Sequence, residues 1–254
     1  MLIPTAPPVR KWKPGPNIVS PLGALEGLST VARFARGESV YQYGEVAEYW
    51  YRIIAGASRK CAFSHDGSRQ IIDFLRPGDL FGYDARDTHS FAVEAIVAGT
   101  VVARYSRRCA EQLADSDPVV ARRVRELAFE SVCRVQSRML ILGRASALEK
   151  VGGFLLEMAD RFATKSGSPV ALPMSRYDIA DYLAMAVETV SRALTLLRER
   201  GVIQFEGVRS VRICDRDPLE RANESLYSES IAPPPSIRDP RVLAQPNSQQ
   251  SPSG

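Results

Sequence analysis

The sequence predicts an α+β protein made of a β-rich N-terminal domain, one long helix, and a C-terminal domain of helices and a short hairpin. Short runs of β-branched and aromatic residues alternate with turn residues from about 30 to 105. A heptad-like apolar seam follows, and then two amphipathic helices are joined by a tight turn. We expect domains over 21–116, 117–143 and 147–226, flanked by disordered segments over 1–20 and 228–254, which are rich in proline and polar residues.

Length and composition allow two modest domains with apolar cores. The chain has 254 residues, of which 45% are hydrophobic, and a formal net charge of +4, which permits a DNA partner without demanding one. No apolar run is long enough to span a membrane, and the first residues lack the apolar core of a signal peptide. We therefore expect a cytoplasmic protein with no membrane partner.

Cysteine and histidine positions argue against a metal or catalytic site. The four cysteines are scattered: Cys61, Cys109, Cys133 and Cys214. They form no C-x-x-C pair, so four reduced thiols are expected in a cytoplasmic protein. His65 and His89 are too few and too far apart for a metal site without several carboxylates. The chain has no G-x-S-x-G, P-loop or G-x-G-x-x-G motif, so we predict no enzyme and no cofactor.

The β region contains several short strands at the spacing of a closed or nearly closed barrel. They are ESVYQYG, YWYRIIAG, RKCAF, RQIIDFL, SFAVEAIV and TVVARYS. His65-Asp66-Gly67 carries a D-G hairpin signal between two of them.

The helix expected from Asp117-Pro118 to about Leu142 carries a seam at alternating three- and four-residue steps. Its members are Val124, Leu127 or Ala128, Val132 or Ser131, Val135, Met139 and Leu142. The seam fits either a helix packed on its own barrel or a helix packed against its two-fold mate.

After a hinge at 143–146 and a helix over 147–162, the stretch Ser175–Arg200 reads as two helices. Ser175 and Asp178 form a capping-box pattern, and Gly201 ends the second helix, which begins at about Val187. One side of that helix is apolar, and the other carries Glu188, Ser191, Arg192 and Thr195. This polar side is either a solvated face or the base-reading face of a helix-turn-helix.

A short hairpin follows the second helix. Val202, Ile203 and Phe205 predict one strand, Glu206-Gly207 a turn, and Val208, Val211 and Ile213 a return strand. Arg209 and Arg212 lie on this wing, where they are suited to phosphate contacts. A short helix is expected from Asp217 to about Leu226.

With this wing, the segment E-T-V-S-R over Glu188–Arg192 resembles the recognition helix of the CRP/FNR transcription regulators. Val187 stands before the glutamate and Ser191 before the last arginine, which is the FNR-like form E-x-x-S-R of this helix. The longer stretch SRYDIADYL…AVETVSRAL is most similar to the FixK-type branch. FNR itself has an N-terminal cysteine group for an iron–sulfur cluster, whereas this chain has no cysteine before Cys61. Because four thiolates are normally needed, we predict no iron–sulfur cluster.

The resemblance implies a cyclic-nucleotide-binding-type β-roll, jelly-roll-like in form, a dimerisation helix and a winged helix-turn-helix. It favours the two-fold packing of the seam at Val124, Leu127, Val132, Val135, Met139 and Leu142. It implies a homodimer that regulates microoxic, anaerobic or nitrogen-fixation genes. The regulator is expected to act mainly as an activator, through contact with RNA polymerase. The implied site is double-stranded DNA of the type TTGAT-N4-ATCAA. Base contacts are expected from Glu188, Ser191 and Arg192, and backbone contacts from Ser175, Arg176, Thr189 and Arg209.

The pocket that holds a cyclic nucleotide in the CRP branch is incomplete in this sequence. Pro77–Gly82 matches its P-G-E-L-G stretch with Asp79 as the acid, but His89-Ser90 stands at the Arg-Ser pair that holds the cyclic phosphate. Histidine supplies at best a partial charge near neutral pH, although Arg86 is close enough in sequence to substitute. We predict no dependence on a cyclic nucleotide.

Two other classes remain open from the sequence. One is a ligand-gated sensor, in which a cyclic nucleotide, or a gas bound through haem, must occupy the barrel before the DNA domains align. The other is a β-barrel enzyme with an accessory helical domain, against which the missing catalytic cluster counts.

Overall fold

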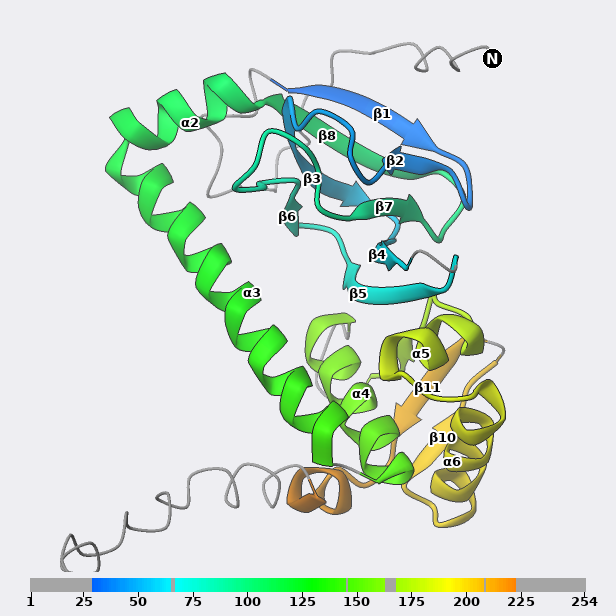
Figure 1. The fold of residues 1–254 in the computed structure, drawn as a ribbon. Coiled ribbons are helices and arrows are strands. Elements are labelled where there is room, and N and C mark those ends of the chain that lie inside the picture. Colours follow the sequence, from blue (N-terminus) through cyan, green and yellow to red (C-terminus); the bar gives the residue numbers. More distant parts are fainter. Residues whose placement is uncertain (1–28, 65–66, 145, 163–167, 208, 223–254) are drawn as a thin grey trace, which may run out of the picture.

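The computed structural model describes residues 29–64, 67–144, 146–162, 168–207 and 209–222 (Figure 1). The predictions for segments 1–20 and 228–254, and for His65 and Asp66, lie outside these ranges. No helix within them is long and apolar enough to cross a membrane.

The N-terminal domain is a β-roll of two four-stranded antiparallel sheets, as predicted. One sheet has the order β1 (Thr30–Phe34), β8 (Thr100–Ser106), β3 (Tyr49–Ala55), β6 (Leu80–Phe81). The other has the order β2 (Ser39–Tyr41), β7 (Ala92–Ala95), β4 (Ser58–Phe63), β5 (Arg69–Leu75). Strands β4 and β5 form a hairpin that pairs Phe63 with Arg69, on either side of the predicted D-G turn.

Large side chains fill the space between the two sheets. Alternate residues of a strand point to opposite faces, so Tyr51 and Ile53 of β3 enter this interior while Trp50 packs on the outside. The interior cluster consists of Phe34, Tyr41, Tyr51, Ile53, Leu75, Phe81, Val93, Ala95 and Val102.

Two helices follow the roll. The first, α2 (Arg107–Ser116), was not predicted, because the apolar side that packs near Trp50 consists of only three residues, Ala110, Leu113 and Ala114. The second, α3 (Pro118–Arg144), has 27 residues and begins with proline at its first position, where no amide partner is needed. Asp117 accepts a hydrogen bond from the Val119 amide at 2.8 Å and so caps α3. Helix α3 then runs from the roll to the C-terminal domain (Figure 1).

The C-terminal domain is a winged helix-turn-helix. Its elements are α4 (Ala147–Phe162), β9 (Val170–Ala171), α5 (Arg176–Leu183), α6 (Val187–Glu199), β10 (Ile203–Phe205) and β11 (Ser210–Ile213). The wing has three strands, in the order β10, β11, β9, because Val170 pairs with Val211. Residues 217–222 are helical, and the rest of that predicted helix lies outside the described ranges.

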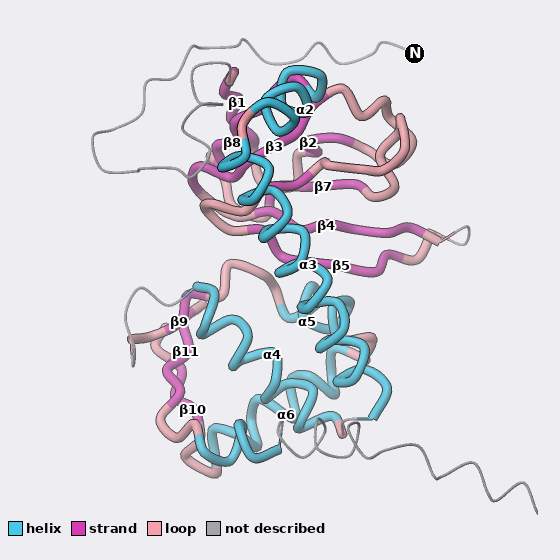
Figure 2. Tube along the Cα trace, turned by 90° about the vertical axis from the view of Figure 1, so that its left-hand side faces the viewer, coloured by secondary structure: helices cyan, strands magenta, loops and turns pink. Residues whose placement is uncertain are grey.

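The roll and the C-terminal domain share one apolar cluster. Phe74 of β5 lies 5.1 Å from the ring of Tyr182 in α5, which lies 5.8 Å from the ring of Phe154 in α4. Figure 2 shows α5 directly beneath the β4–β5 hairpin. This packing places the helix-turn-helix on the roll, with α6 at the end of the domain away from it (Figures 1 and 2).

Candidate nucleic-acid interface

A capping box starts the first helix of the helix-turn-helix, as predicted. The Ser175 hydroxyl accepts a hydrogen bond from the Asp178 amide at 3.1 Å, and Asp178 accepts from the Ser175 amide at 2.8 Å. Burial opposes the charge on Asp178, but the hydrogen bonds from Ser175 and the nearby Arg59 and Arg69 lower its pKa. Ser175 therefore caps α5, while its neighbour Arg176 is exposed, with its guanidinium 5.7 Å from the Phe205 ring.

Helix α6 presents the polar face that the sequence predicts. Val190, Ala193, Leu194 and Leu197 are buried against the domain. Glu188 and Arg192 are exposed, and Thr189 and Ser191 are half-buried. Glu188 and Arg192 are four residues apart, yet within the described chain neither has an ion-pair partner. Both charged groups are therefore available to an external ligand.

The two wing arginines, Arg209 and Arg212, differ in whether an ion pair holds their side chains. Arg209 is exposed at the tip and, among the described residues, has no ion-pair partner. Arg212 donates to Glu206 across the hairpin, which raises the pKa of Arg212. Arg209 is thus better placed than Arg212 for a phosphate contact.

Tyr177, beside Arg176, has 69% of its surface exposed. Sequence analysis did not select it, because an aromatic residue usually indicates a core position.

The seam of α3 divides into two parts. Val124 and Leu127 pack partly against the outer face of the chain's own roll. Further along, Val132, Val135 and Met139 are 51%, 48% and 68% exposed, and Leu142 is half-buried. Phe129, which sequence analysis did not select, is 62% exposed. An apolar stripe of this kind on a long helix is typical of a surface that another chain covers.

The residues at the nucleotide-pocket positions have partners within the protein. Asp79 accepts hydrogen bonds from the Arg76 amide at 2.9 Å and from Arg161 of α4 at 3.0 Å. His89 is buried, stacks on Tyr41 with ring centroids 3.7 Å apart, and lies with Nδ1 2.9 Å from Asp84. These residues connect parts of the fold to one another, and the described residues contain no group of three metal-ligating side chains.

Sequence analysis missed the polar contacts between the domains. Arg59 of β4 pairs with Asp178 at 2.5 Å, and Arg69 of β5 pairs with Asp181 at 2.5 Å. Arg161 pairs with Asp73 at 2.8 Å. These pairs join residues more than eighty positions apart, and a one-dimensional pattern carries no signal for them.

A β-roll, a long helix with an apolar stripe and a winged helix-turn-helix with a free polar face define the class of DNA-binding transcription regulators. Residues 31–117 match the cyclic nucleotide-binding domain, and residues 149–222 match the Crp-like helix-turn-helix domain. The chain belongs to the CRP/FNR family of transcription regulators and, within it, to the FixK-type branch, as the sequence predicted. Members of this family are regulators, which confirms that the chain is not an enzyme.

Individual relatives support this assignment. The chain is 40% identical to the nitrogen fixation regulation protein FixK of Azorhizobium caulinodans over 79% of this chain and 82% of the relative. It is 35% identical to FixK of Rhizobium meliloti over 77% and 88% of the two chains. The solved structure of FixK2 from Bradyrhizobium japonicum aligns with a TM-score of 0.72 at 40% identity, and the alignment covers 76% of this chain and 96% of that one.

Proposed function

We propose that the protein is a FixK-type transcription regulator, mainly an activator, that binds DNA as a homodimer. The carrying observation is the exposed polar face at the N-terminal half of α6, where Glu188 and Arg192 have no ion-pair partner in the described chain. The relatives named FixK regulate nitrogen fixation, and FnrL of Cereibacter sphaeroides, 30% identical, is named a transcriptional activator. The proposed targets are therefore microoxic, anaerobic or nitrogen-fixation genes, regulated in the cytoplasm through contact with RNA polymerase.

The proposed contacts follow from the chemistry of the exposed face. Arginine pairs bidentately with guanine and glutamate accepts from the cytosine amino group, so Arg192 and Glu188 are assigned to a G·C pair in each half of TTGAT-N4-ATCAA. Ser191 lies between them and completes the base-reading set. Ser175, Arg176, Thr189 and Arg209 are assigned to the phosphate backbone, because contacts to the backbone fix the register of the protein without reading sequence.

The test is binding of purified protein, free of nucleotide and metal, to a labelled TTGAT-N4-ATCAA duplex at one fixed salt concentration, because affinity depends steeply on salt. A control duplex has the guanine of each half-site replaced. We expect tight binding that requires the guanines. Equal binding to both duplexes would remove the proposed recognition. Binding that appears only after addition of a cyclic nucleotide would replace it with the ligand-gated alternative.

The apolar stripe supports the homodimer. A two-fold pair of α3 helices would cover Val132, Val135 and Met139 and present two α6 helices to successive major grooves, about 34 Å apart. Val124 and Leu127 would extend the contact toward the roll, and Leu142 toward the hinge.

We predict that the double variant V135E/M139E is monomeric, because it places four carboxylates at the two-fold contact without partners. Light scattering measures the mass, and binding to the palindrome should weaken by about 10²–10⁴-fold as the second half-site contact becomes intermolecular. The matched control is V119E, an exposed valine at the other end of α3 with 71% of its surface accessible. It should leave the mass unchanged. A V135E/M139E protein that remains dimeric would place the interface elsewhere.

A further inference from the structure

The C-terminal end of α5 is held by side chains from outside its own domain. The carbonyl groups in the last turn of a helix have no partner within the helix. In α5 the Asp181 carbonyl accepts a hydrogen bond from Gln70 of β5, and the Tyr182 carbonyl accepts one from Arg138 of α3 at 2.5 Å. A cation at this end also interacts favourably with the helix dipole. The orientation of α5 is thus tied to the roll and to α3.

Arg138 connects three parts of the molecule at once. Its guanidinium also donates to the Ile71 carbonyl at 2.7 Å and the Ile72 carbonyl at 2.5 Å, both in β5. The same group lies 4.0 Å from the centre of the Tyr182 ring. The planar guanidinium can make several directed hydrogen bonds and stack on a ring simultaneously, which a lysine ammonium cannot do.

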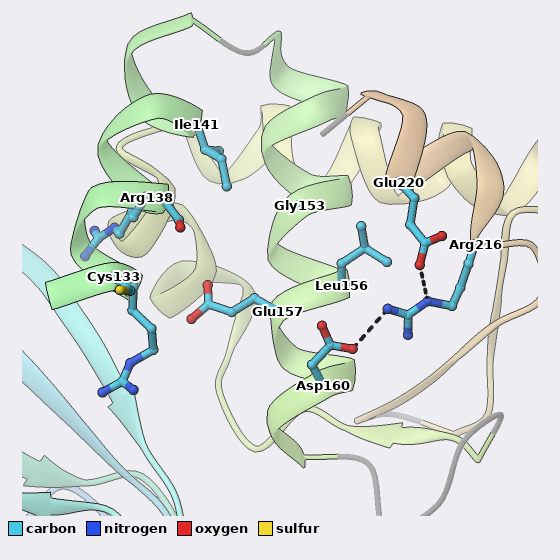
Figure 3. Close-up of a pocket in the computed structure, with 11 residues that line it drawn as sticks. Cys133, Arg138, Ile141, Gly153, Leu156, Glu157, Asp160, Arg216 and Glu220 are labelled. Carbon is cyan, nitrogen blue, oxygen red and sulfur yellow. Dashed lines mark hydrogen bonds and ion pairs between the residues drawn. The ribbon is translucent and has the colours of Figure 1, made fainter. Parts of the chain in front are cut away.

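A groove separates α3 from α4 beside this contact (Figure 3). Ile141 of α3 and Glu157 of α4 point into it from opposite sides (Figure 3). Among the described residues of α3, Arg138 is the one whose side chain hydrogen-bonds to α5. The polar connection from α3 to the helix-turn-helix is therefore concentrated in one side chain.

The contact lies next to the turn that leads to α6. Ala184 adopts a left-handed conformation with φ of 50°, and the Met185 amide donates to the Ala180 carbonyl at 3.0 Å. These interactions fix a tight turn between α5 and α6, so a rotation of α5 is passed to α6. On the other side, Arg138 adjoins Met139, which belongs to the exposed stripe of α3.

We propose that Arg138 is a positioning residue that sets the separation of the two recognition helices in the dimer, and with it the half-site spacing that the protein accepts. This inference rests on the proposed function, because it requires a dimer formed through α3 that binds a palindrome. Arg138 itself lies away from the base-reading face of α6. It acts through Tyr182 and the turn that follows.

The first test compares R138A and R138K with the control R134A. Arg134 lies on the same side of α3 and pairs with Asp73 of the roll at 3.6 Å, but among the described residues it makes no hydrogen bond or ion pair with α5. Affinity is measured for the palindrome, for versions with the spacer one base pair shorter or longer, and for an isolated half-site. The parent and R134A should bind one spacer more tightly than the others by about tenfold or more, because with a mismatched spacer the two subunits cannot bind both half-sites at once.

In R138A this preference should largely disappear while half-site affinity stays near that of the parent. R138K keeps the positive charge but has a slightly shorter side chain without the planar guanidinium, so it should fold and give an intermediate preference. An R138A protein that keeps the spacer preference would overturn the proposal. The proposal would also fall if R138A lost affinity equally for the half-site and for every palindrome, because that result indicates a merely structural loss. Failure of the parent to bind any palindrome would instead remove the proposed function.

The second test needs no DNA. Cys214, in the C-terminal domain, is exposed, whereas Cys61 is buried. In a C109S/C133S background, a spin label on Cys214 reports the distance between the two DNA-binding domains of the dimer. We expect one narrow distance distribution for the background protein and with R134A added, and a clearly broader one with R138A added. An unchanged distribution in R138A would overturn the proposal even if DNA affinity had fallen.

Discussion

Replacement of Arg161 with methionine is expected to lower the free energy of unfolding by about 3–5 kcal/mol, the usual cost of removing one partner from a buried ion pair. The Arg161 side chain is 10% exposed and lies 2.8 Å from Asp73, 3.0 Å from Asp79 and 3.2 Å from Glu157. It also donates to the Phe74 carbonyl. Methionine keeps most of the apolar stem but leaves three carboxylates without their shared cation.

The loss should depend on pH in a defined direction. Burial opposes the charge on Arg161, but the three carboxylates outweigh burial and raise its pKa. Burial already raises the pKa of Asp79 and of Glu157 beside Arg161, and removal of the cation raises both further. The folded variant then holds protons that the unfolded chain has released, so its stability falls as pH rises above the ordinary carboxyl range. The deficit should be larger at about pH 8 than at about pH 5.

Urea unfolding at one protein concentration measures both effects, because the stability of a dimer depends on concentration. The control is R216M. Arg216 also pairs with two carboxylates, Asp160 at 3.0 Å and Glu220 at 2.7 Å, but it is 43% exposed. Exposed pairs contribute about 0–1 kcal/mol. If R161M cost no more than R216M, the ion pairs between α4 and the roll would not be stabilising the fold.

Replacement of Arg192 with alanine is the second large effect. The loss of a bidentate contact to guanine costs about 1–3 kcal/mol per half-site and relaxes the choice of base there. Because a dimer has two such contacts and separate positions add approximately, the palindrome should lose roughly twice that amount. The variant should bind the guanine-replaced duplex as weakly as the parent does.

Fluorescence anisotropy with the two duplexes at fixed salt measures this difference. Arg198, an exposed arginine in the last turn of α6, provides the matched control, and R198A should keep the guanine dependence. R176A should instead weaken binding to both duplexes alike and reduce the salt slope by about one per subunit, as expected for a phosphate contact. If R192A and R176A behaved alike, Arg192 would contact the backbone and not a base.

Local pattern determined the elements that hold the proposed recognition face. The S-x-x-D capping box, the periodicity of α6 and the terminating Gly201 depend on neighbours within about one helical turn, so the start of α5 and the exposure of Glu188 and Arg192 could be predicted. The strands of the N-terminal domain could also be predicted, because they are short β-branched and aromatic runs separated by turns, whereas the form of a β-roll was implied by the family resemblance. Helix α2 could not be predicted, since its apolar side consists of only three residues, two of them small alanines.

Tertiary structure decided how those elements are held together. The stripe of α3 was predicted as one seam, but only the packing of the roll distinguishes Val124, which it partly covers, from Met139, which stays exposed. Asp79 matches a nucleotide-pocket motif in the sequence, yet in the fold its carboxylate accepts a hydrogen bond from Arg161. Arg138 reads as one of several arginines flanking the seam, and only the fold brings it to the last carbonyl groups of α5. Helix caps and periodicity act over a few residues, whereas ion pairs and buried hydrogen bonds join segments that come together only when the chain has folded.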